Sequence, residues 1–430
     1  MTVTVLEGGD VLDRDGRRRL DVAVDDETTT IVAVGHQLSG DRTLDASGAV
    51  ICPGFVDLHV HLRQPGFEAA GTIESGARSA VLGGYTAVVA SADTDPCPDN
   101  PAVVAEIRAL AKSAVCEIVP TGALTKERRG EAMAHYQGLI DAGVRFFSDA
   151  DRSVVDLRVL RNALDYLVTA AEASEVKLVV GQRLHHDLGA GGVMHEGEWS
   201  ARLGLPGSPA ASEELAVAEQ LALARLVGAH VHLQQLSTAR AVRLVAEAKA
   251  DGVPVTAEVS PHHLALTDAR VASFDPNLRL DPPLRPAADV EALRAGLLDG
   301  TIDAVATAHR PHTADAKELA FEEAPAGALG LETALAVLLT DVGLSLEQAL
   351  PVLSWQPAAI AGIADRHGGG VAVGRPANLA VVDPDVRWTV EPARFGGYAT
   401  NSPHRGRELQ GRVRHTVVDG EPVVIDGAGQ

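Results

Sequence analysis

The sequence predicts an α/β protein, a (β/α)8 TIM barrel with a small β-sandwich domain built from both ends of the chain. Alternating apolar and polar residues, typical of strands, run through residues 1–52 and return in residues 366–430. Between them, apolar segments alternate with stretches rich in Ala, Leu and Glu. Eight such units are what a closed parallel barrel requires. We therefore expect a β-domain from residues 1–52 and 366–430, and a barrel over residues 53–365.

The individual elements follow from these patterns. The terminal segments have the period-2 alternation of an antiparallel sheet, and are expected at 2–8, 20–26, 30–35, 374–383, 411–420 and 421–427. The barrel strands are apolar throughout, as strands covered on both faces are, and are expected at 51–61, 85–91, 116–124, 144–150, 177–182, 229–237, 253–260 and 303–309. Helices follow most of them, for example over 211–227 and 238–252. Reacting residues of such a barrel lie at the carboxyl ends of the strands.

Composition excludes several functional classes. With 46% hydrophobic and 22% charged residues, the chain is neither disordered nor a disulfide scaffold. The net charge of −21 disfavours contact with nucleic acid or with anionic lipid. No run of about 18–20 apolar residues predicts a membrane span. The three cysteines form no CxxC pair, which suits a reducing compartment, and we expect a cytoplasmic protein.

The first barrel strand ends in the residues DLHVHLRQPG, positions 57–66. Strand alternation places His59, His61 and Arg63 on one face, at the mouth of the barrel. Two imidazoles at this spacing are half of a metal site, and a guanidinium can bind a carboxylate with two hydrogen bonds. Taken alone, an HxH pair is more often a packing feature than a metal site.

DLHVHLRQPG, together with the barrel pattern and the two terminal β-segments, resembles the dihydroorotase family of cyclic amidohydrolases, in its bacterial type I branch. Further segments resemble the family in its order along the chain, and lie at 191–207, 255–267, 281–286, 297–312, 317–335 and 374–383. The resemblance covers essentially the whole chain. It implies a barrel that binds one or two zinc ions, which activate water to open the ring of dihydroorotate in pyrimidine biosynthesis. In the family, an aspartate at the end of the last strand carries the proton.

Residue by residue, this resemblance is incomplete. His59 and His61 match the family's first two metal ligands, and Arg63 matches its contact to the substrate carboxylate. The two later ligand histidines are Gln182 and Gln235 here. The catalytic aspartate of the family's ATDHAPH is absent, because the matching stretch is ATAHRPH and its third residue is Ala308.

Acidic residues also replace neutral ones around the expected pocket. The family's MPNT reads Ser91–Thr94 and carries Asp93 in place of the asparagine, and the asparagine before PPLR is Asp281. The family's FSDDG reads Phe147–Asp151. His59 and His61 with Asp149 are expected to form at most a weak, open metal site, because structural and catalytic zinc sites use three or four such ligands.

The residues leave three functional hypotheses open. The first is an inactive dihydroorotase-like subunit without a cofactor, joined to aspartate carbamoyltransferase and assembled as a homo- or hetero-oligomer. The second is an amidohydrolase with one metal or none, acting on a small cyclic amide or ureido acid through Arg63 and His312. Its acids are expected among Asp93, Asp149, Asp151 and Asp281. The third is an active dihydroorotase, which needs zinc ligands that the sequence does not reveal.

A structural interpretation accompanies these hypotheses. Glutamine both donates and accepts hydrogen bonds, so Gln182 and Gln235 are expected to complete a network with the histidines of the mouth that leaves no buried group unpaired. These histidines are His59, His61, His309 and His312. Strand alternation turns His230 and His232 away from position 235, and His185 and His186 are expected in a solvated loop.

Overall fold

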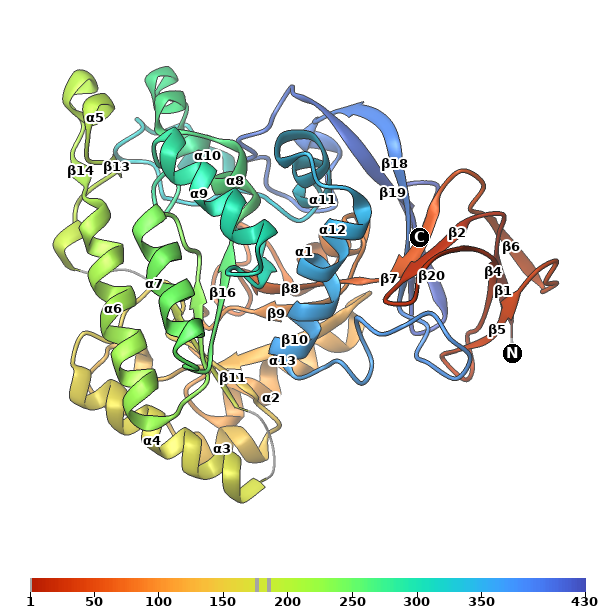
Figure 1. The fold of residues 1–430 in the computed structure, drawn as a ribbon, viewed down its shortest axis with the longest axis horizontal. Coiled ribbons are helices and arrows are strands. Elements are labelled where there is room, and N and C mark those ends of the chain that lie inside the picture. Colours follow the sequence, from red (N-terminus) through yellow and green to blue (C-terminus); the bar gives the residue numbers. More distant parts are fainter. Residues whose placement is uncertain (1, 175–177, 184–186) are drawn as a thin grey trace.

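A computed structural model describes residues 2–174, 178–183 and 187–430 (Figure 1). Its centre is a parallel sheet of eight strands in the order in which they follow along the chain. The strands are β8 (Phe55–Val60), β9 (Tyr85–Ala90), β10 (Glu117–Gly122), β11 (Phe146–Phe147), β12 (Val179–Arg183), β15 (Val231–Gln234), β16 (Val255–Val259) and β17 (Ala304–Val305). The predicted TIM barrel is confirmed.

The barrel closes between its first strand and the residues that follow its last one. Val60 and His309 form a parallel bridge, and the His61 amide donates to the His309 carbonyl at 2.9 Å. Nearby, the Asp57 carboxylate accepts hydrogen bonds from the Thr307 amide and hydroxyl. The family resemblance at positions 57–66 and 297–312 therefore concerns two segments that lie side by side.

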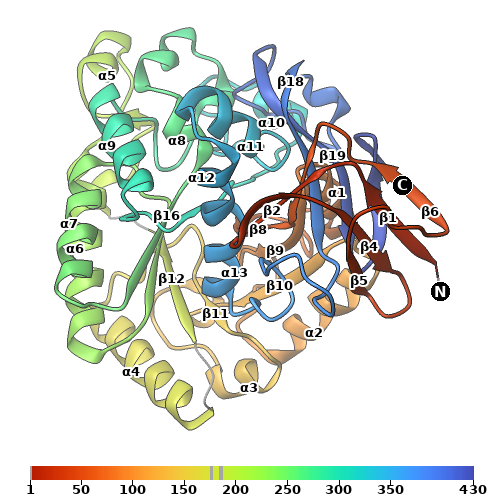
Figure 2. The same cartoon turned by 45° about the vertical axis from the view of Figure 1, so that its right-hand side comes forward.

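Helices cover the outside of the barrel, as seen from two directions in Figures 1 and 2. The helices after strands β8 to β16 are α1 (Ile73–Leu82), α2 (Pro101–Leu110), α3 (Tyr136–Asp141), α4 (Leu157–Ser174), α6 (Ala210–Val227), α7 (Ala239–Ala250) and α9 (Ala287–Leu298). Short helices complete the rest of the barrel: α5 (Glu198–Leu203), α8 (Pro261–Ala265), α10 (Ala314–Lys317), α11 (Ala334–Val337), α12 (Leu346–Leu350) and α13 (Gln356–Ala361). Side-chain caps fix several helix starts; Thr72, Asn100 and Thr238 accept from the amides that begin α1, α2 and α7.

The two ends of the chain form a separate pair of sheets beside the barrel. One sheet has the order β5-β4-β1-β6 and the other β21-β20-β19-β18-β7-β2-β3. The first uses β1 (Val3–Glu7), β4 (Asp21–Asp25), β5 (Thr30–Gly35) and β6 (Arg42–Asp45). The second uses β2 (Asp10–Asp13), β3 (Gly16–Arg19), β7 (Val50–Pro53), β18 (Leu379–Thr389), β19 (Glu408–Val418), β20 (Glu421–Ile425) and β21 (Ala428–Gly429). Strands from both termini therefore share one sheet.

Two details differ from the expectation. The sheets are mixed, because β1 pairs with β6 in parallel and β2 pairs with β7 in parallel. The segment 51–61 is not one strand: β7 belongs to the β-domain and β8 to the barrel. Gly54 separates them, and a Cβ there would lie 2.2 Å from the Thr86 side chain. The chain changes direction where only glycine fits against the neighbouring strand.

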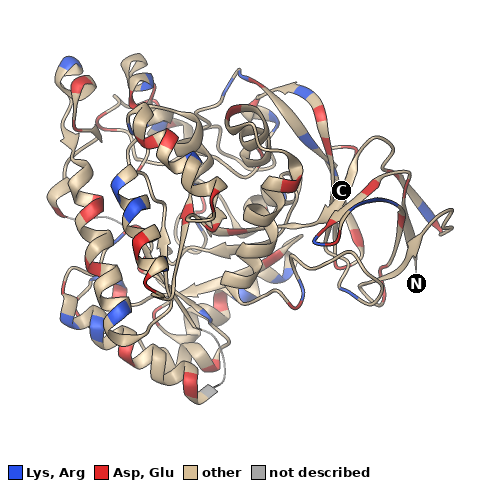
Figure 3. Cartoon of the chain, in the orientation of Figure 1, with Lys and Arg blue, Asp and Glu red and all other residues tan. Residues whose placement is uncertain are grey.

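The barrel strands carry few charged residues, and charges of both signs lie along its outer helices (Figure 3). The interior is packed with aliphatic and aromatic side chains from the strands and the inner faces of the helices. Of the helices in the described ranges, none is both long enough and apolar enough to cross a bilayer.

Candidate active site at the barrel mouth

The end of β8 brings the three predicted residues to the carboxyl side of the barrel. The rings of His59 and His61 lie with centroids 5.1 Å apart. His61 Nδ1 lies 2.7 Å from Asp93 Oδ2, and Arg63 Nη1 lies 3.3 Å from the same oxygen. Arg63 Nε also donates to the Pro311 carbonyl. Asp93 follows β9, so the two neighbouring strands meet through this carboxylate.

The charge of Asp93 is strongly favoured. Burial raises the pKa of a carboxyl group, but here His61, Arg310 and Arg63 together hold the pKa of Asp93 well below its usual range. Burial lowers the pKa of His61 to about 3. We therefore assign a neutral His61 ring at pH 7, whose Nδ1 hydrogen is donated to Asp93 and whose Nε2 is an acceptor.

A second buried cluster lies inside the barrel below the mouth. Glu258 on β16 accepts from His59 Nδ1 and from His232 Nε2, both at 3.0 Å. Burial raises the pKa of Glu258, but the hydrogen bonds from His232 and His59 outweigh burial and set it at about 2. His232 therefore bears on the position of His59 through the shared Glu258 carboxylate. A single glutamate in an apolar strand belongs to no motif, so the role of Glu258 could not be predicted from the sequence.

The three positions that depart from the family pattern lie at the carboxyl ends of barrel strands. Gln182 and Gln235 are buried at the ends of β12 and β15, and Ala308 follows β17. Gln235 and Ala308 have φ of 58° and 52°, a left-handed conformation that is uncommon for non-glycine residues and clusters at functional sites.

The expected fully paired network is wrong. Gln182 Nε2, Gln235 Oε1 and His59 Nε2 are buried and have no hydrogen-bond partner within the described part of the chain. His309 accepts instead from the amides of Gly330 and Leu331. Buried polar atoms are rarely left unpaired. The unpaired atoms of Gln182, Gln235 and His59 therefore indicate a place for a polar ligand or water.

Three further predicted residues take different positions. Asp149 accepts from the amides of Leu124 and Thr125, so its carboxylate holds a loop and does not join the two histidines. Asp281 borders the mouth cavity. His312 lies against the Ala326 carbonyl, with Nε2 at 2.9 Å. His185 and His186 lie outside the described residues.

The family's zinc does not fit these donors. His59 and His61 supply two ring nitrogens, whereas a zinc site takes at least three protein ligands of the Cys, His or carboxylate type. Within residues 2–174, 178–183 and 187–430, no three such side chains lie close enough together to hold a metal ion. Gln182 and Gln235 offer neutral amides in the ligand positions, and amides are poor zinc donors.

The mouth encloses little free space. A cavity of about 20 Å³ lies among His61, Gln235, Asp281, Ala308 and Arg310. This volume accommodates about one water molecule. A ring-shaped ligand therefore enters only when side chains around it move.

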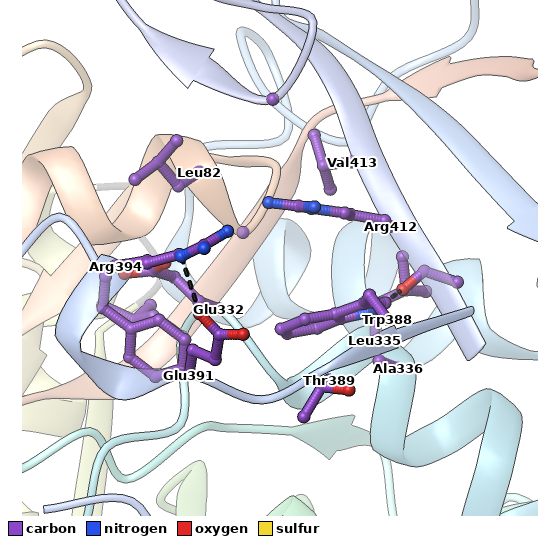
Figure 4. A pocket seen from close by; sticks show the side chains of 15 residues that line it. Leu82, Glu332, Leu335, Ala336, Trp388, Thr389, Glu391, Arg394, Arg412 and Val413 are labelled. Carbon is purple, nitrogen blue, oxygen red and sulfur yellow. Dashed lines mark hydrogen bonds and ion pairs between the residues drawn. The ribbon is translucent and has the colours of Figure 1, made fainter. Parts of the chain in front are cut away.

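A larger cavity of about 220 Å³ lies elsewhere, between α1, α11 and the β18–β19 hairpin (Figure 4). Arg412 covers the Trp388 ring, with its guanidinium carbon 5.4 Å from the ring centroid. Burial raises the pKa of Glu332, on the same cavity, to about 8. This cavity shares no lining residue with the mouth, and contains none of the predicted site residues.

Comparison with known proteins agrees with the fold and the order of these segments. The model of the dihydro-orotase-like family matches residues 48–241. A protein named dihydroorotase from Pelotomaculum thermopropionicum is 40% identical over 98% of each chain, and one from Streptomyces coelicolor is 43% identical over 99% of each. The chain belongs to the dihydroorotase family. A dihydroorotase from Mycobacterium tuberculosis is 42% identical over 95% of this chain and 96% of its own.

Solved structures agree on the fold. The L-hydantoinase (dihydropyrimidinase) from Arthrobacter aurescens matches all of this chain and 98% of its own, with a TM-score of 0.86 and 24% identity. A likeness at this identity concerns architecture alone.

These relatives correct one expectation. The chain was expected to be an inactive subunit, because Gln182, Gln235 and Ala308 replace reacting residues. Full-length relatives at 40–43% identity are named dihydroorotase, which contradicts that expectation and favours an enzyme. That expectation rested on the missing zinc ligands and the missing aspartate, whereas the cluster of His61, Asp93 and Arg310 becomes visible only in the structure. The association with aspartate carbamoyltransferase stays a prediction.

Proposed function

We propose that this chain is a hydrolase of the dihydroorotase type, acting on a small cyclic amide that carries a carboxylate, with dihydroorotate as the first candidate. The observation that carries the proposal is the 40–43% identity, over nearly the whole length, with proteins named dihydroorotase. The retained His59, His61 and Arg63 at the barrel mouth support it.

The unpaired atoms of the mouth suit an amide. Gln182 Nε2 is a donor and Gln235 Oε1 an acceptor, and both lack partners among the described residues. His59 Nε2 is an acceptor when Nδ1 donates to the Glu258 carboxylate. An amide or ureide edge offers one acceptor beside one donor, which is the complement of this pair of glutamines.

The charges of the mouth suit a carboxylate. Arg63 and Arg310 both lie near Asp93, at 3.3 Å and 3.9 Å from Oδ2. A substrate carboxylate can accept hydrogen bonds from some of the N–H groups of these guanidiniums, which bind carboxylates in a planar, bidentate geometry. The substrate must compete with Asp93 for them, so we expect weak binding.

Ring opening then requires little beyond these residues. Water adds to the ring carbonyl carbon, the ring C–N bond breaks, and the leaving nitrogen takes up the proton that the base removed from the water. His61, oriented by Asp93, presents Nε2 as the acceptor for the proton of the attacking water. Because a ring with a pKa of about 3 is a weak base, we expect slow turnover.

The test is the hydrolysis of dihydroorotate to its ureido acid. A colorimetric assay follows this reaction and its reversal, once with protein treated with a chelator and once with protein supplemented with zinc. Wild-type protein should form product, and Arg63→Met should raise KM at least tenfold. Arg129→Met is the matched control, because this side chain is 61% exposed and pairs with Glu127 on a loop. Absence of product, or equal rates in wild type and Arg63→Met, would refute the proposal.

A further inference from the structure

Arg310 adds a guanidinium to the mouth where the family's ATDHAPH has an alanine. Its Nη2 lies 2.9 Å from Asp151 Oδ2 and 3.9 Å from Asp93 Oδ2. Asp151 also accepts from Arg128 at 2.8 Å, which anchors this carboxylate from the other side. The guanidinium therefore sits between two acidic residues, one of them firmly held.

The backbone is shaped to receive this side chain. Gly327 has a φ of 133°, and a Cβ on it would lie 2.7–2.9 Å from the Cβ, Cγ and Cδ atoms of Arg310. The Arg310 amide donates to the Ala328 carbonyl, and its own carbonyl accepts from Asn401 Nδ2. The side chain is only 17% exposed. Arg310 is thus a built-in part of the mouth.

One donor of Arg310 remains available. Its Nε is buried and has no hydrogen-bond partner in the described part of the chain. The same side chain lines the mouth cavity together with Gln235 and Ala308, two of the positions where the family has a ligand and its acid. An unpaired charged donor therefore lies beside the place where the family keeps its metal.

Three departures from the family pattern meet at this point. Asp93 replaces an asparagine, Asp151 a glycine and Arg310 an alanine, and these residues come from the ends of three different strands. In the structure they form one ion network. Separate losses of function would not be expected to produce charges that pair with one another.

We propose that the Arg310 guanidinium supplies a fixed positive charge in place of a metal ion at this mouth, binding the ligand's carboxylate or carbonyl oxygen and excluding zinc. A guanidinium stays charged at all accessible pH values and presents planar donors. It stabilises negative charge on an oxygen. It also repels a divalent cation placed beside it. The ligand part of this inference rests on the proposed function, whereas the exclusion of zinc does not.

The first test uses zinc alone. The triple variant Gln182→His/Gln235→His/Ala308→Asp introduces the metal-binding residues of the family pattern. Its zinc affinity is measured by competition with a chelator, with and without the further change Arg310→Ala. Adding Arg310→Ala should tighten zinc binding at least tenfold, whereas adding Arg129→Ala should not. Equal affinities, or stoichiometric zinc retained by wild-type protein after dialysis against a chelator, would overturn the inference whatever the activity.

The second test uses dihydroorotate and metal-stripped protein in calorimetry. Arg310→Ala should weaken binding at least tenfold, and Arg310→Lys, which keeps the charge, should restore part of the loss. Thermal melts confirm that each variant is folded. Unchanged binding by Arg310→Ala would overturn the ligand role. A wild-type protein that neither binds nor hydrolyses dihydroorotate would refute the proposed function, while the zinc result would still decide whether Arg310 excludes the metal.

Discussion

Replacing Asp93 by asparagine should make the protein less stable and a better binder of a carboxylate ligand. Asp93 Oδ2 lies 2.7 Å from His61 Nδ1, 3.3 Å from Arg63 Nη1 and 3.9 Å from Arg310 Nη2. Its carboxylate is buried, and its single negative charge faces both guanidiniums. Asparagine has nearly the same shape and keeps an acceptor for His61, but it removes the negative charge.

Breaking a buried ion pair costs about 3–5 kcal/mol. Arg310 keeps Asp151 as a partner, and asparagine keeps hydrogen bonds, so we expect a loss of about 2–3 kcal/mol in the free energy of unfolding. The effect on the binding of a carboxylate ligand has the opposite sign, so binding becomes stronger. Two carboxylates about 6 Å apart repel by about 3 kcal/mol at an effective dielectric constant of about 20. Relief of half of this repulsion strengthens binding about tenfold.

Urea denaturation at pH 7 measures the first effect, and calorimetric titration with dihydroorotate measures the second. Asp365→Asn serves as the control, because its carboxylate is 73% exposed and pairs with Arg366 at the surface. It should change neither quantity appreciably. An Asp93→Asn protein as stable as wild type, or one that binds dihydroorotate no better, would show that Asp93 is not the counter-charge of the two guanidiniums.

Three other changes have defined outcomes. Arg285→Met leaves the buried Glu213 carboxylate without its cation, 3.7 Å away, and should cost about 3–5 kcal/mol in urea unfolding; a loss below 1 kcal/mol would contradict this. Burial raises the pKa of Glu332 to about 8 in the folded state, so its stability contribution is complete below about pH 4.5 and is lost as the pH rises through 8. Glu332→Gln should therefore raise Tm more at pH 9 than at pH 5, and an equal shift at both would refute the assignment. Gly327→Ala should lower Tm and weaken dihydroorotate binding by displacing Arg310, and unchanged binding would mean that the Arg310 stem can move freely.

The barrel could be predicted because its signal is local. A strand covered on both faces is apolar throughout, so each such strand can be recognised from its own residues alone. Gly54 shows where this reasoning ends. The segment 51–61 is one apolar run, yet its first residues pair with β18 and the rest with β9. Only the contact of Gly54 with Thr86, across two strands, explains the division.

The site was predicted in part. His59 lies on β8, and His61 and Arg63 follow within three residues of its end, so their closeness is predicted by their spacing. Alternation does not extend to Arg63, which has a φ of 68°. Gln235 and Ala308 lie beyond their strands in left-handed conformations, where alternation no longer fixes the direction of a side chain. Asp149 was expected beside the histidines, but its oxygens are taken by amides of a neighbouring loop.

The sequence by itself determined the succession of strands and helices and the residue types at positions 182, 235 and 308, because both are properties of single positions or short segments. Only the tertiary structure decided which charges face one another. Glu258 joins His59 across 199 residues of chain, and Arg310 reaches Asp151 across 159. Such pairs leave no periodic trace in the sequence, since their energy depends on a distance in space that the closed barrel alone fixes.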